Sequence, residues 1–399
     1  MHPFAIVILA ALLLNHLLGV LADWLNLRAL RSELPAEFDG VYDADAYRTS
    51  QAYTRERTRF GLLSGSVGLA VLLAFWGFGG FPALDAAVRA LGFGEIPTGL
   101  LFIGALLLLQ TALSLPFSLY STFVIEERYG FNRTTPGVFA ADMAKSFALS
   151  LLLGGPLLAG VLGFFHAAGP AAWLYVWGMV TAVSLALQYV APVWILPLFN
   201  RFTPLPDPEL KERVLAYAAR VGFPVRDVLM MDGSKRSTKS NAFFTGFGRN
   251  KRIALFDTLL ERHSGDEILA VVAHEVGHSK LRHIQTGMLT GILHTGALLF
   301  VLSLFLGQPG LFEAFGMREM SVHAGLVFFG LLYSPVELAL SVALNALSRR
   351  HEFQADAYAA RTTGNPGAMI DALKKLSRDN LSNLTPHPLQ VWLHFSHPP

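Results

Sequence analysis

The sequence has no cysteine and little charge. Without cysteine there is no disulfide and no thiolate metal site, so any bound metal must be held by histidine, aspartate or glutamate. Only 15% of the 399 residues are charged and 53% are hydrophobic, whereas soluble globular proteins carry about a quarter charged residues. The net charge of +2 gives no basic surface of the kind that binds nucleic acid. The composition therefore indicates a protein of the lipid bilayer, without nucleic acid as a partner.

Long runs without charge predict seven transmembrane helices. A helix needs about 20 mostly apolar residues to cross the hydrocarbon. The predicted spans are residues 3–22, 61–79, 98–125, 147–168, 173–199, 286–307 and 322–345. Spans four and five are separated by "HAAGPAAW", in which Gly169 and Pro170 predict a turn. The first segment lacks a positively charged start and a cleavage site, so we expect a span rather than a signal peptide.

The distribution of positive charge predicts the orientation. Of the 31 lysines and arginines, 29 lie in four segments on one side of the predicted spans. These segments are residues 23–59, 126–146, 201–285 and 349–399. Only Arg89 and Arg318 lie on the other side. Because cytoplasmic loops carry the excess of positive charge, we expect the N-terminus outside and the long 201–285 segment in the cytoplasm.

The long polar segment predicts a small α+β insert. "DPELKERVLAYAARVGF" has the apolar stripe of a helix, "RDVLMMDG" predicts a short strand, and "SNAFFTGFGRNKRIALFD" predicts a hairpin around "GFGRNK". Ser264 and Glu267 form a predicted capping box, so a helix begins near Gly265. We expect this helix to continue directly into the sixth span. The predicted units are spans one to five (1–200), the insert (201–285), spans six and seven (286–348) and a C-terminal tail (349–399).

The predicted helix contains "HEVGH", which has the spacing of a catalytic zinc site. Residues four apart lie on one face of a helix, so His274 and His278 can bind one ion. Glu275 lies beside that face, in the arrangement of zinc with a general base. Zinc brings the pKa of its water to near neutrality and polarises a carbonyl, while Glu275 accepts the proton and returns it to the leaving amine. We therefore expect one Zn²⁺ per chain.

A catalytic zinc needs a third protein ligand and an open position. Glu352, in "NALSRRHEFQAD", is the best candidate, because it follows span seven on the cytoplasmic side. Asp356 is one helical turn further on and can accept a hydrogen bond from a ligand imidazole. Glu337 competes with Glu352, because a carboxylate within a span is costly and usually functional. Taken alone, Glu352 could also be an ordinary solvated residue at the end of a helix. Asp142 and Lys145, at the start of span four, are expected either to line an interior space or to end a helix.

Together, these segments resemble the type I CAAX prenyl proteases, a family of integral-membrane zinc metallopeptidases. The likeness covers essentially the whole chain. It includes "HEVGH" with "NALSRRHEFQADAYA", the loop "VIEERYGFNRTTPGVFAADMAKS", the hairpin "SNAFFTGFGRNKRIALFDTLL" and the terminal "WLHFSHPP". In the family the last motif is followed a few residues later by an arginine, and this sequence has no residue after Pro399.

The resemblance implies a fold and a set of roles. The implied fold class is mainly α, with seven transmembrane helices around an intramembrane chamber and a small α+β zinc-protease insert. The implied zinc ligands are His274, His278 and Glu352, with Glu275 as the base and Asp356 supporting the site. His397 corresponds to a family histidine that stabilises the oxyanion. Without the resemblance, a single histidine near a terminus would be interpreted as a surface residue. Asn241 corresponds to a residue that binds the substrate backbone; the residues after it, Ala242 and Phe243, either share that role or belong to a buried hairpin.

The predicted function is that of a membrane zinc endopeptidase acting near the C-terminus of a peptide or protein, which the resemblance extends to prenylated CAAX tails. One alternative is a quality-control zinc protease acting on misfolded membrane proteins. Another is a seven-helix channel or transporter with structural zinc, although structural zinc has no need of Glu275 and usually has four protein ligands. The richness in alanine, leucine, glycine and arginine favours a bacterial inner membrane, with the endoplasmic reticulum expected for a eukaryotic source.

Overall fold

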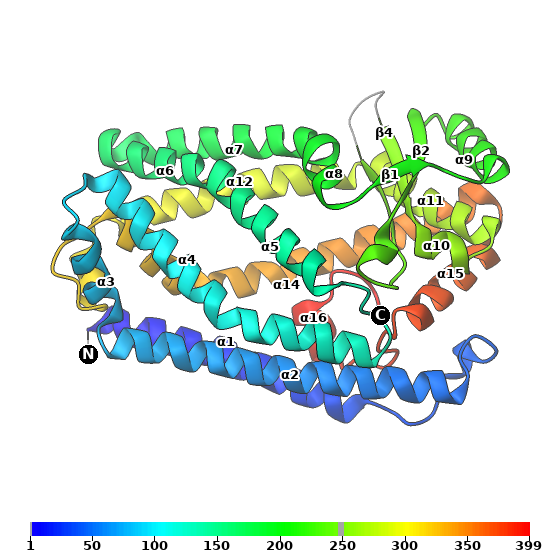
Figure 1. Cartoon of the computed structure of the whole chain (residues 1–399), viewed down its shortest axis with the longest axis horizontal. Helices are drawn as coiled ribbons and strands as arrows, with labels where there is room; N and C mark the ends of the chain where they lie inside the picture. Colours follow the sequence, from blue (N-terminus) through cyan, green and yellow to red (C-terminus); the bar gives the residue numbers. More distant parts are fainter. Residues whose placement is uncertain (1, 246–250) are drawn as a thin grey trace.

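The computed structural model describes residues 2–245 and 251–399. Within these residues, seven helices are long and apolar enough to cross a membrane, which confirms the predicted number (Figure 1). Three are single α-helices: α1 (Pro3–Ala29), α2 (Ala44–Gly77) and α12 (His283–Phe305). The longest is α14 (Val322–Thr363), whose first part is span seven and whose last turns extend into the insert. α1 and α14 end later than the predicted spans and α2 begins earlier, because charged residues extend these helices into the polar regions, whereas α2 and α12 each end two residues before the predicted bound.

The three remaining spans contain π-helical turns. Span three is α4 (Glu95–Tyr120) with η2 (Ser121–Glu126), span four is α5 (Pro136–Leu149), η3 (Ser150–Gly154) and α6 (Gly155–Ala167), and span five is α7 (Ala172–Val190), η5 (Ala191–Ile195) and α8 (Leu196–Phe199). Each wide turn has a proline within it or close to it: Pro116, Pro156 and Pro192. Proline lacks the amide hydrogen that an α-helix requires, so the helix distorts locally while remaining continuous.

Among the described residues, two large cores lie at the two ends of the molecule, and Tyr53, Ile125 and Phe131 form a small third cluster. One joins the ends of the spans to α3 (Gly80–Arg89) and α13 (Pro309–Glu313), with Phe102, Phe312 and Phe328 at its centre. The other lies within the insert, around Val214, Leu255 and Ile268. Between them the spans bury little: in the apolar window of α2 no residue is buried, and in that of α14 only 11% are. The helices are therefore accessible on more than their lipid-facing sides, as in a hollow bundle.

The insert is built on a four-stranded sheet with the order β1-β2-β4-β3. The strands are β1 (Phe202–Pro204), β2 (Val225–Met231), β3 (Ala242–Thr245) and β4 (Lys251–Phe256). β2 and β4 are parallel, and β3 and β4 form the predicted antiparallel hairpin. Its "GFGRNK" turn falls almost entirely outside the described residues. β3 is the edge strand of the sheet, so one side of its backbone is directed away from the sheet.

Helices cover this sheet and continue into the tail. They are α9 (Pro208–Arg220), α10 (Asp257–Arg262), α11 (Gly265–Lys280), α15 (Pro366–Asp379) and α16 (Pro388–His394). The α9 stripe is confirmed, with Leu210, Val214 and Tyr217 buried. The capping box is also confirmed: the Ser264 hydroxyl accepts from the Glu267 amide, and the Glu267 carboxylate accepts from the Ser264 amide.

The expected continuous helix from the insert into span six is wrong. α11 ends at Lys280, and α12 begins at His283 after a two-residue turn. Arg282 in this turn has a φ of 61°, a left-handed conformation that costs about 1–2 kcal/mol for a residue with a side chain. The sequence gives no warning of the break, because glycine is the residue that usually marks such a conformation.

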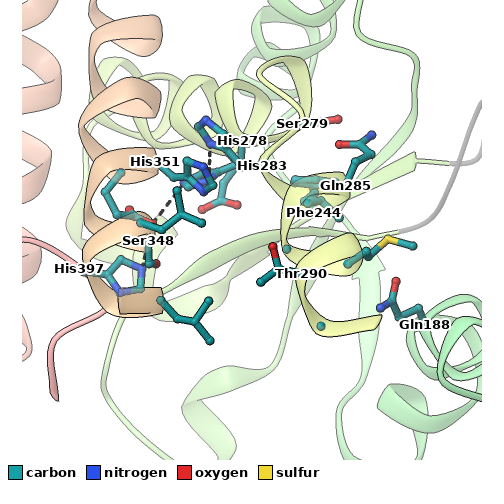
Figure 2. Close-up of a pocket in the computed structure, with 18 of the residues that line it drawn as sticks. Gln188, Phe244, His278, Ser279, His283, Gln285, Thr290, Ser348, His351 and His397 are labelled. Atoms are coloured by element: carbon teal, nitrogen blue, oxygen red, sulfur yellow. Dashed lines mark hydrogen bonds and ion pairs between the residues drawn. The ribbon is translucent and has the colours of Figure 1, made fainter. Parts of the chain in front are cut away.

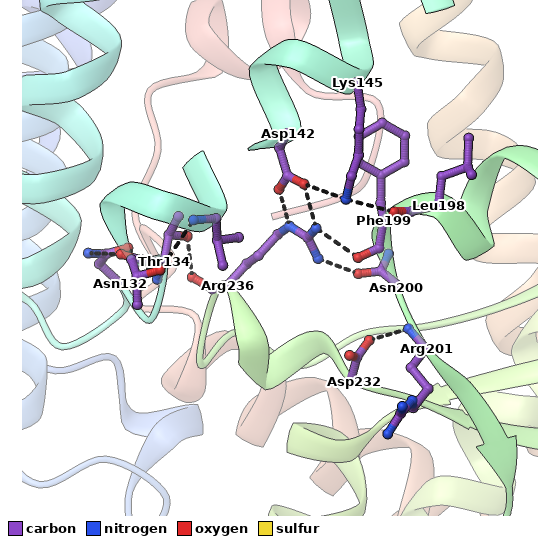
Figure 3. Close-up of polar contacts among 12 residues, drawn as sticks. Asn132, Thr134, Asp142, Lys145, Leu198, Phe199, Asn200, Arg201, Asp232 and Arg236 are labelled. Carbon is purple, nitrogen blue, oxygen red and sulfur yellow. Dashed lines mark hydrogen bonds and ion pairs between the residues drawn. The ribbon is translucent and has the colours of Figure 1, made fainter. Parts of the chain in front are cut away.

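Arg236 connects the insert to the membrane helices (Figure 3). Its Nε and Nη2 donate to the two oxygens of Asp142 on α5, at 2.7 and 3.0 Å. Its Nη1 donates to Asn200 Oδ1 at 2.6 Å, and Nη2 also donates to the Phe199 carbonyl at 2.8 Å. Arg236 thus joins spans four and five to the segment just before β3. Of the two roles predicted for Asp142, lining an interior space or ending a helix, it has neither; it binds Arg236 instead.

The backbone on either side of Arg236 pairs with the loop after span three. Arg133 N donates to the Arg236 carbonyl at 3.0 Å, and Thr238 N donates to the Phe131 carbonyl at 3.1 Å. Lys239 Nζ then reaches Glu126 Oε2 at 3.1 Å. These contacts fix the position of residues 236–239, and so of β3, relative to the membrane helices.

We expect Arg236 and Asp142 to be energetically coupled. Both side chains are mostly buried, and hydrogen bonds between charged groups contribute about 1.5–3 kcal/mol. Arg236→Gln and Asp142→Asn should each lower the melting temperature in detergent, and the double variant should lower it by less than the sum. Arg48→Gln, which breaks the exposed Arg48–Asp45 pair, is the control and should change little. Additive effects of the two single variants would show that the pair is not coupled.

Candidate metal centre

Three side chains from two helices converge on one point. His274 and His278 come from α11, and Glu352 comes from α14. The Nε2 atoms of the two histidines are 3.0 Å apart, and the Glu352 oxygens lie 3.3 Å from His274 Nε2 and 3.5 Å from His278 Nε2. All three candidate donor atoms lie within 4.8 Å of one another. The structure therefore brings together the three residues predicted as metal ligands.

The spacing of these atoms fits a tetrahedral ion. Zinc binds imidazole nitrogen and carboxylate oxygen at about 2.0–2.2 Å, so neighbouring ligands of a tetrahedron lie about 3.3–3.5 Å apart. The distance from each histidine to its nearer Glu352 oxygen falls in this range, with Oε2 facing His274 and Oε1 facing His278, and the distance between the two imidazole nitrogens is 0.3 Å shorter. Three electron-pair donors this close together repel unless protons or a metal ion lie between them. The donor set therefore fits a metal such as zinc.

Asp356 fixes the orientation of His274. It lies one turn after Glu352 on α14, and its Oδ1 is 2.8 Å from His274 Nδ1. A carboxylate can only accept here, so Nδ1 carries a hydrogen, and Nε2 is the nitrogen that faces Glu352 and His278, where it holds either a second proton or a metal ion. Burial lowers the pKa of His274, but the hydrogen bonds with Asp356 and Glu352 outweigh it and raise the pKa to about 9. The site thus strongly favours positive charge at His274, whether a proton or a metal.

Glu275 lies beside the three donors in the wall of a cavity of about 930 Å³. Burial raises the pKa of its carboxyl group, against the opposing effect of His274 and His278. The cavity extends from the histidines along α12 and α14, where Met288, Leu344 and Leu347 make its wall apolar. Figure 2 shows His278, His283 and His351 beside one another, with Gln188 away from them across the cavity. A candidate proton acceptor therefore faces a space that continues into the membrane.

A glycine in the motif allows the two helices to approach. A Cβ built on Gly277 would lie 3.2 Å from the Cα of Ala355 and 3.3 Å from its carbonyl oxygen. Ala355 is fully buried, and it lies between Glu352 and Asp356 on the contacting face of α14. The close contact between Gly277 and Ala355 is thus what places both carboxylates against the histidines.

The C-terminal segment places His397 at the edge of the site. Its Nε2 is 3.5 Å from Glu352 Oε1, and its side chain is 72% exposed. Arg349 on α14 fixes the approach of this segment, because its Nη1 donates to the carbonyls of Val391 and Phe395 at 3.1 and 2.6 Å. His397 therefore lies beside Glu352 at the edge of the centre, open to solvent.

The edge strand β3 presents backbone groups in a regular alternation. Phe256 N donates to the Asn241 carbonyl at 3.1 Å. The backbone N–H and C=O groups of Asn241 and Phe243 are therefore directed toward β4, and those of Ala242 and Phe244 toward the open edge. The exposed Asn241 uses its Oδ1 to accept from Ala242 N at 2.8 Å. Phe244, which the sequence analysis did not single out, also lines the cavity.

Glu337 lies apart from the three donors. Its Oε2 is 3.4 Å from His294 Nε2 on α12, so its partner is a histidine of the cavity wall. The sequence analysis also missed His283, whose ring contacts His278. The sequence gives no signal for this contact, because the contact depends on the break between α11 and α12.

Fold and site together are those of an integral-membrane metallopeptidase, with the candidate metal centre between a helix of the insert and an extended membrane helix. Residues 23–201 match the family described as CAAX prenyl protease N-terminal, five membrane helices. Residues 204–399 match peptidase family M48. The chain belongs to peptidase family M48, with the N-terminal membrane region of the CAAX prenyl proteases. This is a family of metallopeptidases, so a metal ion is implied, and the predicted enzyme class and multi-pass membrane location are confirmed.

Similar proteins cover nearly the whole chain. A CAAX prenyl protease 1 homolog of Oryza sativa subsp. japonica is 37% identical and aligns over 100% of this chain and 95% of its own. CAAX prenyl protease 1 of Saccharomyces cerevisiae is 35% identical over 92% of this chain and 86% of its own. The crystal structure of S. mikatae Ste24p matches with a TM-score of 0.95 and 33% identity, covering 100% of this chain and 97% of that one. The predicted fold class is confirmed.

We expect Gly277→Ala to lower both the melting temperature and the affinity for zinc. The added methyl group would push α14 away, and overpacking of this kind costs about 1–3 kcal/mol. This exceeds the gain of about 1 kcal/mol that alanine brings to a helix. Gly330→Ala on α14 is the matched control, because a Cβ there meets nothing within 4 Å. If Gly277→Ala raised the melting temperature as much as the control, the proposed importance of this contact would be wrong.

Proposed function

We propose that the chain is a zinc endopeptidase that cleaves CAAX-type tails near the C-terminus of its substrates, including prenylated ones. The observation that carries the proposal is the convergence of His274, His278 and Glu352 next to Glu275 and the apolar cavity. The similar proteins from rice and yeast are CAAX prenyl proteases by name, which supports the substrate class.

His274, His278 and Glu352 would hold one zinc ion, with Asp356 orienting His274. Zinc bound there would supply a Lewis acid and an activated water. Glu275 would accept a proton from the attacking water and donate it to the departing amine. Burial raises the pKa of Glu275 toward the value at which a carboxyl group can perform both transfers near neutral pH. His397 would donate a hydrogen bond to the oxygen that becomes negative as the carbonyl is attacked.

The open edge of β3 would bind the substrate as an added strand. The outward carbonyl of Ala242 and the outward backbone of Phe244 can pair with an extended peptide. Asn241 would contribute its exposed amide nitrogen, and Phe243 would support the strand from its inner side. An apolar group on the substrate, such as a prenyl chain, would be accommodated by the cavity wall around Met288, Leu344 and Leu347.

The first test compares the wild type with Glu275→Gln in detergent. Zinc per chain is measured by elemental analysis, and cleavage is measured on a farnesylated CAAX peptide and its unprenylated counterpart. Both proteins should carry one zinc, while Glu275→Gln should lose at least about 10²-fold in cleavage rate, because it cannot accept a proton. The farnesylated peptide should be cleaved faster by the wild type, because the cavity binds its apolar chain.

The matched control for the metal is Glu352→Ala, which should lose most of its zinc. Full zinc in Glu352→Ala would reject Glu352 as a ligand, and undiminished cleavage by Glu275→Gln would reject the proposed base. Equal cleavage of the two peptides would reject the role of the cavity in prenyl binding and favour a protease of unmodified proteins. No cleavage of either peptide by zinc-loaded wild type would reject the CAAX substrate class.

For the orientation, we propose an N-terminus outside and an active site on the cytoplasmic side, as the lysine and arginine distribution indicates. The composition favours a bacterial inner membrane. The absence of cysteine makes single-cysteine labelling direct. An impermeant maleimide should label Met320→Cys in intact cells, and Ser32→Cys only after permeabilisation; both positions are exposed. The reverse pattern would overturn the orientation.

A further inference from the structure

His283 makes a chain of contacts that the proposed mechanism does not use. It is the first residue of α12 and is 7% exposed. Its Nδ1 lies 3.2 Å from His278 Nδ1, and its Nε2 lies 3.0 Å from Gln354 Oε1 on α14. Its ring stacks on His351 with centroids 4.0 Å apart and planes at 6° (Figure 2). His283 therefore contacts the side of His278 that faces away from Glu352.

The chemistry of these partners determines where each hydrogen lies. An amide oxygen can only accept, so His283 Nε2 donates its hydrogen to Gln354. In a neutral imidazole the other nitrogen then has a lone pair, so His283 Nδ1 accepts from His278 Nδ1–H. The remaining nitrogen of His278, Nε2, is left with its lone pair directed at His274 and Glu352. A neutral histidine can thus orient a metal ligand as a carboxylate does.

The backbone provides an independent sign that this position is specified. Arg282, directly before His283, adopts a φ of 61°, which is unfavourable for a residue with a side chain. If α11 continued past Lys280 as a regular helix, Arg282 would not need this conformation, but His283 would lie further along the α11 axis, away from His278. The break between α11 and α12 therefore returns the His283 ring to the motif from which the chain has just emerged.

We propose that His283, held by Gln354, is a positioning residue that fixes the tautomer and ring orientation of His278 for metal binding. It is the counterpart of Asp356, which does the same for His274, and it differs in being uncharged. This inference rests on the proposed metal centre. Its rival is a purely packing role, in which His283 only stacks against His351.

The test uses two variants of similar size. His283→Asn places an amide oxygen close to the position of the imidazole Nδ1, so it keeps the acceptor for His278. His283→Leu fills the space without an acceptor. The dissociation constant for zinc is measured by competition with a chelator, together with the visible spectrum of the Co²⁺-substituted protein and the melting temperature of the metal-free protein. None of these measurements depends on catalytic activity.

His283→Leu should weaken zinc binding about 10–100-fold, the usual effect of losing such a partner, and should change the Co²⁺ spectrum. His283→Asn should bind zinc nearly as well as the wild type. Equal zinc affinity and equal spectra for His283→Leu and wild type would overturn the inference, as would equal losses in both variants, which indicate ring packing. A wild type that binds no zinc would instead overturn the metal centre itself.

If His283→Leu does not fold, Gln354→Leu still tests the inference, because this variant keeps the histidine and its stacking on His351. It removes only the acceptor that fixes the His283 tautomer, so zinc binding should weaken by a smaller factor than in His283→Leu. Unchanged zinc affinity and an unchanged Co²⁺ spectrum in Gln354→Leu would overturn the role given to Gln354.

Discussion

The close crossing of α11 and α14 is the constraint on which the site depends. Gly277 lies inside the HEVGH motif, and a Cβ there would meet the backbone of Ala355 and the ring of Tyr358, so the contact leaves no room for a larger residue. Glu352 and Asp356 lie on either side of that contact and reach His274 at 3.3 and 2.8 Å. The glycine of the motif therefore has a packing role: it lets the two helices approach closely enough for the carboxylates to reach the histidines.

The two cores explain how such a centre can be rigid beside an open space. One core joins the membrane helices at the end away from the insert, and the other holds α11 against the sheet. The middle of the spans buries few residues and contributes cavity wall instead. Stability is thus concentrated at the two ends, and the part between them is available to hold a substrate.

Much of the fold could be predicted from the sequence because its signals are local. Charge-free runs predict spans, and the Ser264–Glu267 pair predicts the start of α11 within one residue. Glu352 and Asp356 are one helical turn apart, which suggested a shared face before their contact with His274 was known. What could not be predicted depends on tertiary geometry: the break at Arg282 has no glycine to announce it, and the role we propose for His283 appears only when that break returns its ring to His278. The contribution of Phe244 depends on which backbone groups of β3 face outward, and this requires the register with β4.

The link between residues 236–239 and the membrane helices has a consequence for how this enzyme can be divided. The matches to known families split the chain after residue 201, and the peptidase part looks self-contained on that basis. Yet a fragment starting at residue 204 would carry Arg236 and Lys239 without Asp142 and Glu126, leaving two cations without these partners next to β3. These contacts tie the peptidase part to the membrane helices, and a soluble version would need new anions in place of those two carboxylates.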